Sequence, residues 1–163
     1  MSGSEENERD HPGVIAPPPV IFAAAVVLAM ALHWLLPIPL PALLMIEEVR
    51  YGVGPALAVL SVMIAMASIR RFRKAGTNVP PWQATTTIVE TGPYRFTRNP
   101  MYLGLAGLYL GIGLIVGGLW LAVLFVPFVI VIQRGVILRE EVYLARKFGD
   151  VYLDYKSRVR RWF

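Results

Sequence analysis

Four apolar stretches, separated by polar or proline-rich segments, dominate the pattern of the chain. Two of them cover residues 20–36 and 51–69, and a longer apolar run over residues 101–138 is interrupted at Gly117-Gly118. The longer run exceeds one membrane span and suits two antiparallel helices, 101–116 and 119–138, joined by a tight turn. The pattern therefore predicts an all-α integral membrane protein with about four transmembrane helices, the last two forming a helical hairpin.

Three polar segments complete the pattern. Residues 1–19 are acidic and then proline-rich, with no basic region ahead of a short apolar core, which predicts a disordered tail and not a signal peptide. Residues 70–100 form a long loop after the second span. In residues 139–163, apolar and aromatic positions recur at three- and four-residue intervals, which predicts an amphipathic interfacial helix with a break at Gly149. We expect one membrane domain over residues 20–163.

Composition supports a membrane protein and excludes several kinds of site. Of the 163 residues, 56% are hydrophobic and 17% are charged, which is more apolar than an ordinary soluble domain. The chain has no cysteine, which excludes thiolate metal sites and cysteine nucleophiles, and its two histidines exclude a multi-histidine metal site. We therefore expect no bound metal.

The net charge of +5 could indicate a nucleic-acid partner, but the distribution of cations indicates membrane topology instead. Six of the 16 Lys and Arg residues lie in residues 70–98 and eight lie in residues 134–161, whereas Glu47 and Glu48 lie in the loop after the first span. Lys and Arg concentrate in cytoplasmic loops. We expect both basic segments to lie at the cytoplasmic face of the cell inner membrane, against anionic headgroups, with no nucleic-acid partner.

Glycines recur in the third apolar stretch, and two pairs have four-residue spacing: Gly107 with Gly111 and Gly113 with Gly117. Such pairs let helix backbones approach closely in lipid. The close packing could be within one chain or between two, so the oligomeric state stays open.

The segment from Thr91 to Tyr102 is polar, cationic and rich in turns, and it leads into the third apolar stretch. Asn99 suits a helix N-cap, and Pro100 suits the first helical position. The free N–H groups of such a helix start, together with Arg95 and Arg98, favour an anionic ligand such as a carboxylate or phosphate. The simpler interpretation is that the arginines only mark the cytoplasmic end of a span.

An antiparallel hairpin would bring this helix start to the same membrane face as Glu140 and Glu141, which follow the fourth span. An adjacent carboxylate pair is costly to desolvate unless a cation meets it. One pocket would then hold backbone donors, arginines and carboxylates. Such a pocket suits a zwitterionic ligand that carries both an ammonium and a carboxylate.

These clusters resemble the two ordered motifs of the isoprenylcysteine carboxyl methyltransferase and phospholipid methyltransferase group. The first motif begins at Gly92 and reads Gly-Pro-Tyr-Arg-Phe-Thr-Arg-Asn-Pro-Met-Tyr-Leu-Gly. The second begins at Glu140 and reads Glu-Glu-x-x-Leu-x-x-x-Phe-Gly-x-x-Tyr-x-x-Tyr-x-x-x-Val. The match as a whole spans residues 86–159. The resemblance implies a membrane enzyme that binds S-adenosylmethionine without a Rossmann domain, between the hairpin and the C-terminal segment.

The resemblance also implies residue roles. Glu140 would receive the cofactor's ammonium and the amides near Asn99 and Pro100 its carboxylate, while Tyr94 or Tyr102 would pack on the adenine or face the sulfonium. The implied cofactor contacts are Thr86, Thr87, Ile88, Val89, Tyr94, Asn99, Pro100, Met101, Tyr102 and Glu140. No covalent enzyme intermediate is needed, because the methyl sulfonium is already activated.

Two positions depart from the family pattern. Asn99 stands where the motif usually has His, and Val136 stands where the prenylcysteine enzymes place an Arg that holds the substrate carboxylate. The second departure argues against a prenylcysteine carboxylate as acceptor. The candidate catalytic residues that remain are Arg134, Arg139, Glu140 and Glu141.

The leading hypothesis is methyl transfer from S-adenosylmethionine to a lipophilic small molecule or lipid at the cytoplasmic membrane face, a phospholipid amine being one specific case. The alternative is a non-enzymatic membrane scaffold or binding protein that keeps the fold. A transporter is disfavoured, because, apart from His33, residues usually ionised at neutral pH are absent from the interiors of the predicted spans.

Overall fold

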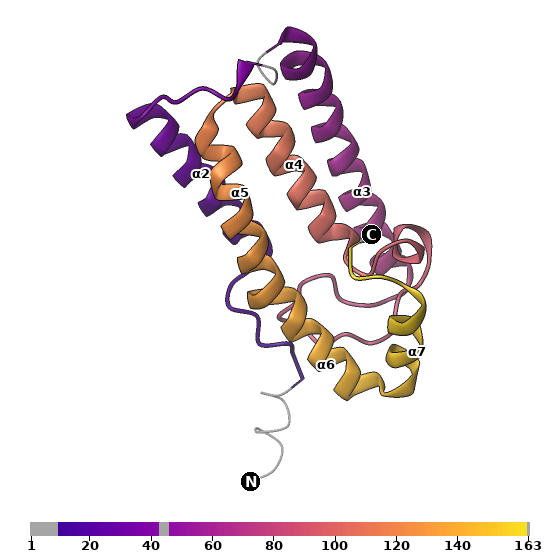
Figure 1. Cartoon of the computed structure of the whole chain (residues 1–163). Coiled ribbons are helices and arrows are strands. Elements are labelled where there is room, and N and C mark those ends of the chain that lie inside the picture. The colour runs from indigo at the N-terminus through magenta and orange to yellow at the C-terminus, as the bar shows by residue number, and fades with distance from the viewer. Residues whose placement is uncertain (1–9, 43–45, 163) are drawn as a thin grey trace.

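The structure is a computed structural model and describes residues 10–42 and 46–162, in which the chain is helical with no β-strand. Figure 1 shows the long helices side by side, with shorter helices and a long loop at one end. The helices are α2 (Pro18–Leu35), the π-helix η2 (Glu48–Val53), α3 (Gly54–Lys74), the 3-10 helix η3 (Gly92–Arg95), α4 (Pro100–Val116), α5 (Leu119–Ile132), the π-helix η4 (Gln133–Ile137), α6 (Leu138–Phe148) and α7 (Asp150–Arg158).

The all-α membrane fold is confirmed. Three helical stretches are long and apolar enough to cross a membrane: Pro18–Leu35, Glu48–Lys74 and Leu119–Phe148. The helix α4 is also apolar but shorter, with 17 residues. The count of four spans therefore stays a prediction.

The predicted hairpin turn between α4 and α5 is present. Gly117 ends α4 in the left-handed conformation, with φ 72°, and its N–H donates to the carbonyl oxygen of Gly113. A residue with a side chain is strained in that conformation, which explains the glycine. The turn lets α5 start at Leu119 and run back antiparallel to α4.

The glycines of α4 pack against small residues of α3 within the chain. A Cβ added at Gly104 would lie 2.8 Å from the carbonyl oxygen of Ser61, and one at Gly111 would lie 2.9 Å from the backbone nitrogen of Ala58. Among the described elements, α3 and α4 share the most extensive contact. Glycine at these positions therefore lets the two backbones approach closely.

The helix that contains the fourth apolar stretch continues past residue 138, the predicted end of the span. It runs without a break from Leu119 through η4 and α6 to Phe148, although charged residues follow Leu138. The 14 residues of α5 and the five of η4 cover about 28 Å at 1.5 Å per residue, close to a hydrocarbon thickness of about 30 Å. We therefore place α6 beyond the hydrocarbon core. Similarly, α3 extends to Lys74, past the predicted end at residue 69.

The C-terminal segment is two helices and a tail, not one helix to residue 163. Gly149 separates α6 from α7 with φ 52°, which confirms the predicted break. After Arg158 the chain becomes extended at Val159 and returns toward α4. Trp162 packs against the central apolar cluster of α2, α4 and α5.

Part of the predicted N-terminal tail is ordered. Residues 1–9 lie outside the described residues, but Asp10 forms an ion pair with Lys147, and the N–H of Ile15 donates to the carbonyl oxygen of Gly135 at 3.1 Å. A Cβ at Gly135 would overlap the side chain of Ile15, so the glycine leaves room for it. Residues 10–17 therefore pack on η4 and α6 because apolar and charged partners are available there.

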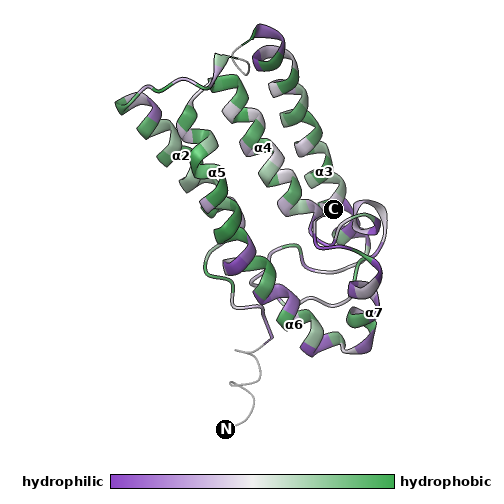
Figure 2. Cartoon of the chain, viewed as in Figure 1, coloured by the Kyte–Doolittle hydropathy of each residue, from purple (hydrophilic) through white to green (hydrophobic). Residues whose placement is uncertain are grey.

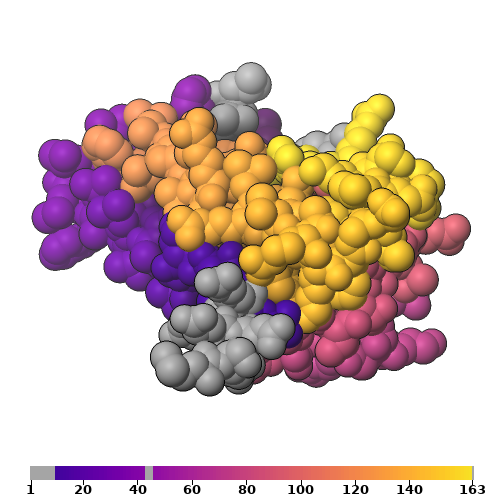
Figure 3. All heavy atoms as spheres, turned by 90° about the horizontal axis from the view of Figure 1, so that it is seen from below, coloured from indigo at the N-terminus to yellow at the C-terminus, as the bar shows by residue number. Residues whose placement is uncertain are grey.

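Hydrophobic residues dominate the four long helices, and hydrophilic residues gather at the end that holds α6, α7 and the loop (Figure 2). Seen from that end, the C-terminal helices lie beside the loop of residues 75–99, with the N-terminal segment next to both (Figure 3). The hydrophilic residues of the described chain are thus gathered mainly at one end of the long helices.

Candidate functional site

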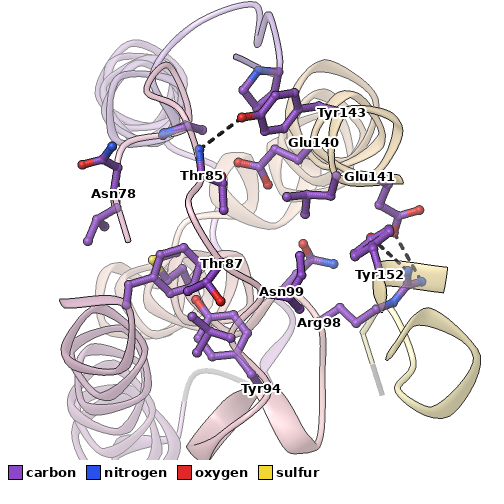
Figure 4. Close-up of a pocket in the computed structure, with 18 of the residues that line it drawn as sticks. Asn78, Thr85, Thr87, Tyr94, Arg98, Asn99, Glu140, Glu141, Tyr143 and Tyr152 are labelled. Atoms are coloured by element: carbon purple, nitrogen blue, oxygen red, sulfur yellow. Dashed lines mark hydrogen bonds and ion pairs between the residues drawn. The ribbon is translucent and has the colours of Figure 1, made fainter. Parts of the chain in front are cut away.

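A pocket opens at this polar end, between the loop, the last turn of α3, the first turn of α4, and the helices α6 and α7 (Figure 4). Its empty space is about 760 Å³, open mouth included. The residues that line it are Pro12, Phe72, Asn78, Val79, Pro80, Pro81, Thr85, Thr87, Ile88, Val89, Tyr94, Arg98, Asn99, Met101, Tyr102, Glu140, Glu141, Tyr143, Leu144, Tyr152 and Tyr155.

The hairpin brings the two predicted clusters together in this pocket. Tyr102, on the first turn of α4, donates its hydroxyl to Oε1 of Glu140 at 2.6 Å. Glu140 lies on α6, 38 residues later, and both side chains line the pocket. The contact follows from the antiparallel course of α4 and the continuous helix α5–η4–α6.

Glu140 has no cationic partner among the described residues. Its carboxylate is partly buried and points toward the interior of the pocket (Figure 4). Burial and the neighbouring Glu141 raise the pKa of Glu140 to about 7, although the hydrogen bond from Tyr102 opposes that shift. The pocket therefore holds a carboxylate that ionises near neutral pH and would gain from a cation.

Glu141 has the opposite environment. Its carboxylate points away from Glu140, toward Arg98, and is 7% exposed (Figure 4). It pairs with Arg161 at 2.7 Å, Arg98 at 3.3 Å and Lys156 at 3.6 Å. Burial raises the pKa of Glu141, but the hydrogen bonds and charges of these cations outweigh it, so the pKa is lowered overall. The negative charge of Glu141 is therefore neutralised by cations of the protein.

Two other polar groups in the pocket wall have unused donor capacity. The Nε of Arg98 and the hydroxyl of Tyr94 are buried and have no hydrogen-bond partner among the described residues. The ring of Tyr94 packs against Phe72, with ring centroids 5.2 Å apart. Buried polar atoms are normally hydrogen-bonded, so these two groups are suited to a ligand.

Asn99 precedes α4 as predicted, but its side chain does not cap the helix. Its Nδ2 donates instead to the carbonyl oxygen of Arg161, at 3.0 Å. The C-terminal tail, whose return was not predicted, thus holds the side-chain amide of Asn99 through its NH₂ group. The first N–H groups of α4, at Met101 and Tyr102, are left without a side-chain cap.

The loop supplies a third wall of the pocket. Thr87, Ile88 and Val89 line it as expected, whereas Thr86 does not. The N–H and hydroxyl of Thr86 bond within the loop, to Oγ1 of Thr77 and the carbonyl of Gly76. Pro100 is also absent from the lining, because it is buried at the start of α4.

Arg134 and Arg139 are not brought to the pocket. Both are exposed, and Arg139 donates to the carbonyl oxygen of Gly13 at 2.7 Å. The continuous helix explains this, because Arg139 precedes Glu140 by one residue and its side chain points about 100° away around the axis. The geometry therefore leaves Glu140 and Glu141 as the members of the expected catalytic group that line the pocket.

Several lining residues were not among the predicted site residues. Tyr143 accepts a hydrogen bond from the N–H of Thr85 at 3.1 Å, and Arg98 donates to the hydroxyl of Tyr152 at 3.3 Å (Figure 4). Tyr143 lies three residues after Glu140, which places both on one helix face and was a usable signal. Tyr152 belongs to an aromatic periodicity that was assigned to the membrane interface alone.

The family model for phospholipid methyltransferases matches residues 49–151. The chain belongs to the phospholipid methyltransferase family. An uncharacterized protein of Haemophilus influenzae is 47% identical to it over 64 residues, which are 38% of this chain and 98% of that protein. No solved structure matches.

Membership of the phospholipid methyltransferase family, together with the apolar helices, identifies a membrane protein of a methyltransferase family. The family match runs from the start of the α3 stretch into α7 and includes most of the pocket wall. The N-terminal segment and the C-terminal tail lie outside it.

Proposed function

We propose that this protein transfers a methyl group from S-adenosylmethionine to a lipid or lipophilic small molecule in the membrane. The observation that carries the proposal is Glu140, a pocket carboxylate with no cationic partner among the described residues, beside the start of α4. Family membership supports methyl transfer as the chemistry and a phospholipid as the class of acceptor.

The residues present fit the groups of S-adenosylmethionine. Glu140 offers a carboxylate for the α-ammonium, and the uncapped N–H groups of α4 offer donors for the carboxylate. Phe72 and Tyr94 supply aromatic faces for the adenine or the sulfonium. The orphaned Tyr94 hydroxyl, 4% exposed as a residue, also needs a partner.

When bound, S-adenosylmethionine supplies a methyl group already activated by its positively charged sulfur. The protein then has to orient the ligand, bring the acceptor atom in line with the methyl group and exclude water. Tyr102 orients Glu140 through the 2.6 Å hydrogen bond, and the loop residues Thr87 to Val89 close the side of the pocket. No nucleophile of the protein is required.

The acceptor is best described as an amine of a phospholipid headgroup. Val136, which stands where prenylcysteine enzymes carry an Arg, is fully buried in the apolar cluster and cannot hold a carboxylate. Both the family and this buried valine therefore favour an amine nucleophile. Because the pocket lies at the polar end, beside the ends of α3 and α4, a headgroup could reach it laterally from the bilayer.

The distribution of charge supports a cytoplasmic orientation of the pocket. The basic segments 70–98 and 134–161 both belong to the polar end, and Glu47 and Glu48 belong to the opposite end. The bias of Lys and Arg toward cytoplasmic loops then supports a pocket at the cytoplasmic face of the cell inner membrane.

Calorimetric titration of the detergent-purified chain with S-adenosylmethionine tests the proposal. We expect saturable binding to the wild type, and about 100-fold weaker binding to Glu140→Gln, because removing one partner of a buried charge pair typically costs 2–5 kcal/mol. The matched control is Glu47→Gln, an exposed carboxylate at the far end, which should bind like the wild type. A folded wild type that does not bind would overturn the proposal.

A further inference from the structure

The C-terminal tail, residues 159–162, lies at the polar end of the molecule and contacts residues of the pocket wall, namely Asn99 and Glu141. It leaves α7 at Val159 in an extended conformation. The tail lies outside the residues that match the family, so family membership does not account for it. Arg161 makes most of its polar contacts.

Arg161 binds two separate elements at once. Its guanidinium makes a two-pronged contact with Glu141 of α6, from Nε to Oε1 at 2.7 Å and from Nη2 to Oε2 at 2.9 Å. Its carbonyl oxygen accepts hydrogen bonds from Oγ1 of Thr97 at 2.9 Å and from Nδ2 of Asn99 at 3.0 Å. Thr97 and Asn99 are buried residues of the segment that enters α4.

Neighbouring residues fix the tail on both sides of Arg161. The carbonyl oxygen of Arg160 accepts the N–H of Arg98 at 2.9 Å, and the indole of Trp162 donates to Oε1 of Gln133 at 2.9 Å. The tail thus joins the start of α4 to η4 and α6. These are the elements that carry Tyr102 and Glu140 into the pocket.

We propose that Arg161 is a positioning residue for the cofactor pocket, which it serves in two ways. Through its carbonyl and guanidinium it fixes the start of α4 relative to α6. Through its charge it neutralises Glu141, so that Glu140 is the pocket carboxylate whose negative charge remains available to the ligand's ammonium. The proposal rests on the proposed function, because it assumes that Glu140 receives the ligand's ammonium.

The charge effect can be separated from the packing effect. Without Arg161, Glu141 would retain Arg98 at 3.3 Å and the 41% exposed Lys156 at 3.6 Å, which are longer contacts. Glu140 would then ionise at a higher pH, because less of the neighbouring negative charge is neutralised. The other ionisable groups that line the pocket are Arg98, which pairs with Glu141, and the tyrosines Tyr94, Tyr102, Tyr143, Tyr152 and Tyr155.

The test is titration of the full chain with S-adenosylhomocysteine over a pH series. For Arg161→Gln we expect about tenfold weaker binding at pH 7, within the usual range of coupling between sites, and a pH midpoint of binding shifted upward. Arg161→Lys keeps the positive charge but cannot make the two-pronged contact with Glu141. It should therefore keep the wild-type pH midpoint of binding and recover part of the affinity that Arg161→Gln loses. The matched control is Arg158→Gln in the same segment, whose partners are Glu90 and Asp154; it should match the wild type.

Hydrogen exchange without ligand gives a second readout. In Arg161→Gln the amides of residues 97–103 should exchange faster than in Arg158→Gln, because the tail is no longer tied to Glu141 of α6 and its carbonyl contacts with the start of α4 are less firmly positioned. Equal exchange, affinity and midpoint in these two variants would overturn the inference while leaving the proposed function intact. No binding by the wild type would instead overturn the proposed function. If Arg161→Gln does not fold, Arg161→Lys still tests the positioning role, because loss of the two-pronged contact with Glu141 should weaken binding and speed exchange of residues 97–103 relative to Arg158→Gln.

Discussion

Adjacent carboxylates serve different purposes at the residue scale. Glu141 is compensated by Arg98, Lys156 and Arg161, while Glu140 has a single hydrogen bond, from Tyr102, and no described cation. Successive side chains on a helix point about 100° apart, so one faces the tail and the other faces the pocket. One carboxylate is thereby paired within the protein, and the other lines the pocket without a cation among the described residues.

Binding of S-adenosylmethionine should weaken as the pH falls. The pKa of Glu140 is about 7, so between pH 7 and pH 6 its ionised fraction drops from about one half to about one tenth, and affinity should fall about fivefold. The ligand's own ammonium remains charged in this range, because α-amino groups titrate near 8. Calorimetry at pH 6.0, 6.5 and 7.0 measures the effect, and the residual binding of Glu140→Gln should not follow it. A flat profile in the wild type would contradict the role of Glu140.

Replacing Tyr94 with Phe should separate stability from binding. The Tyr94 hydroxyl is buried with no partner among the described residues, so its removal should raise the free energy of unfolding of the ligand-free protein by about 1 kcal/mol. The same change should weaken S-adenosylmethionine binding, because the ligand would supply the missing partner. Thermal unfolding in detergent and calorimetry give the two values. Unchanged affinity would show that the hydroxyl does not face the ligand.

At the scale of elements, the contact between α3 and α4 positions one wall of the pocket, because Phe72 lies in the last turn of α3 and Tyr102 in the first turn of α4. Gly104 and Gly111 allow that contact. A Cβ added at either glycine would meet backbone atoms and Ala Cβ atoms of α3, so the fit cannot relax by a rotamer change.

The variant Gly111→Ala should destabilise the protein by about 1–3 kcal/mol, the usual cost of overpacking. Its Cβ would lie 2.9 Å from the nitrogen of Ala58 and from the oxygen of Gly54, both backbone atoms. The control is Gly52→Ala, whose Cβ would meet nothing within 4 Å. Thermal unfolding of both variants in one detergent makes the comparison, and equal midpoints would refute the packing argument.

Features encoded locally could be predicted from the sequence, and features that depend on distant segments could not. The turn at Gly117, the start of α4 at Pro100 and the break at Gly149 each follow from a residue's own backbone preference. The side chain of Asn99 did not cap its helix, because its acceptor comes from Arg161, 62 residues away. Local helix signals also did not show that charged residues after Leu138 continue the preceding helix.

The candidate site residues also divide into those that the sequence could predict and those that it could not. The two motifs placed Tyr102 and Glu140 in one pocket, because an antiparallel hairpin requires it. Arg134 and Arg139 were selected for charge and proximity in sequence, but the helical rotation takes them away from the pocket. Arg161 gave no signal of its own, since a basic residue near a membrane is most simply a topology anchor.

On the scale of the whole molecule, the long helices are apolar and the candidate site lies at the polar end (Figure 2). The segments at both ends of the described chain, residues 10–17 and 159–162, fold back onto that end and contact α6 or the start of α4. Residues 49–151, which match the family, therefore supply most of the pocket wall, and segments outside that match contact it. This arrangement suits a reaction between a water-soluble methyl donor and an acceptor that stays in the bilayer.

The most direct measurement of this account is methyl transfer in reconstituted vesicles. The wild type and Glu140→Gln would be placed in phospholipid vesicles that contain phosphatidylethanolamine and supplied with methyl-labelled S-adenosylmethionine. The account predicts that label enters the organic-solvent extract with the wild type, and falls to the level of empty vesicles with Glu140→Gln. A folded wild type that binds S-adenosylmethionine but transfers no label to lipid would contradict it.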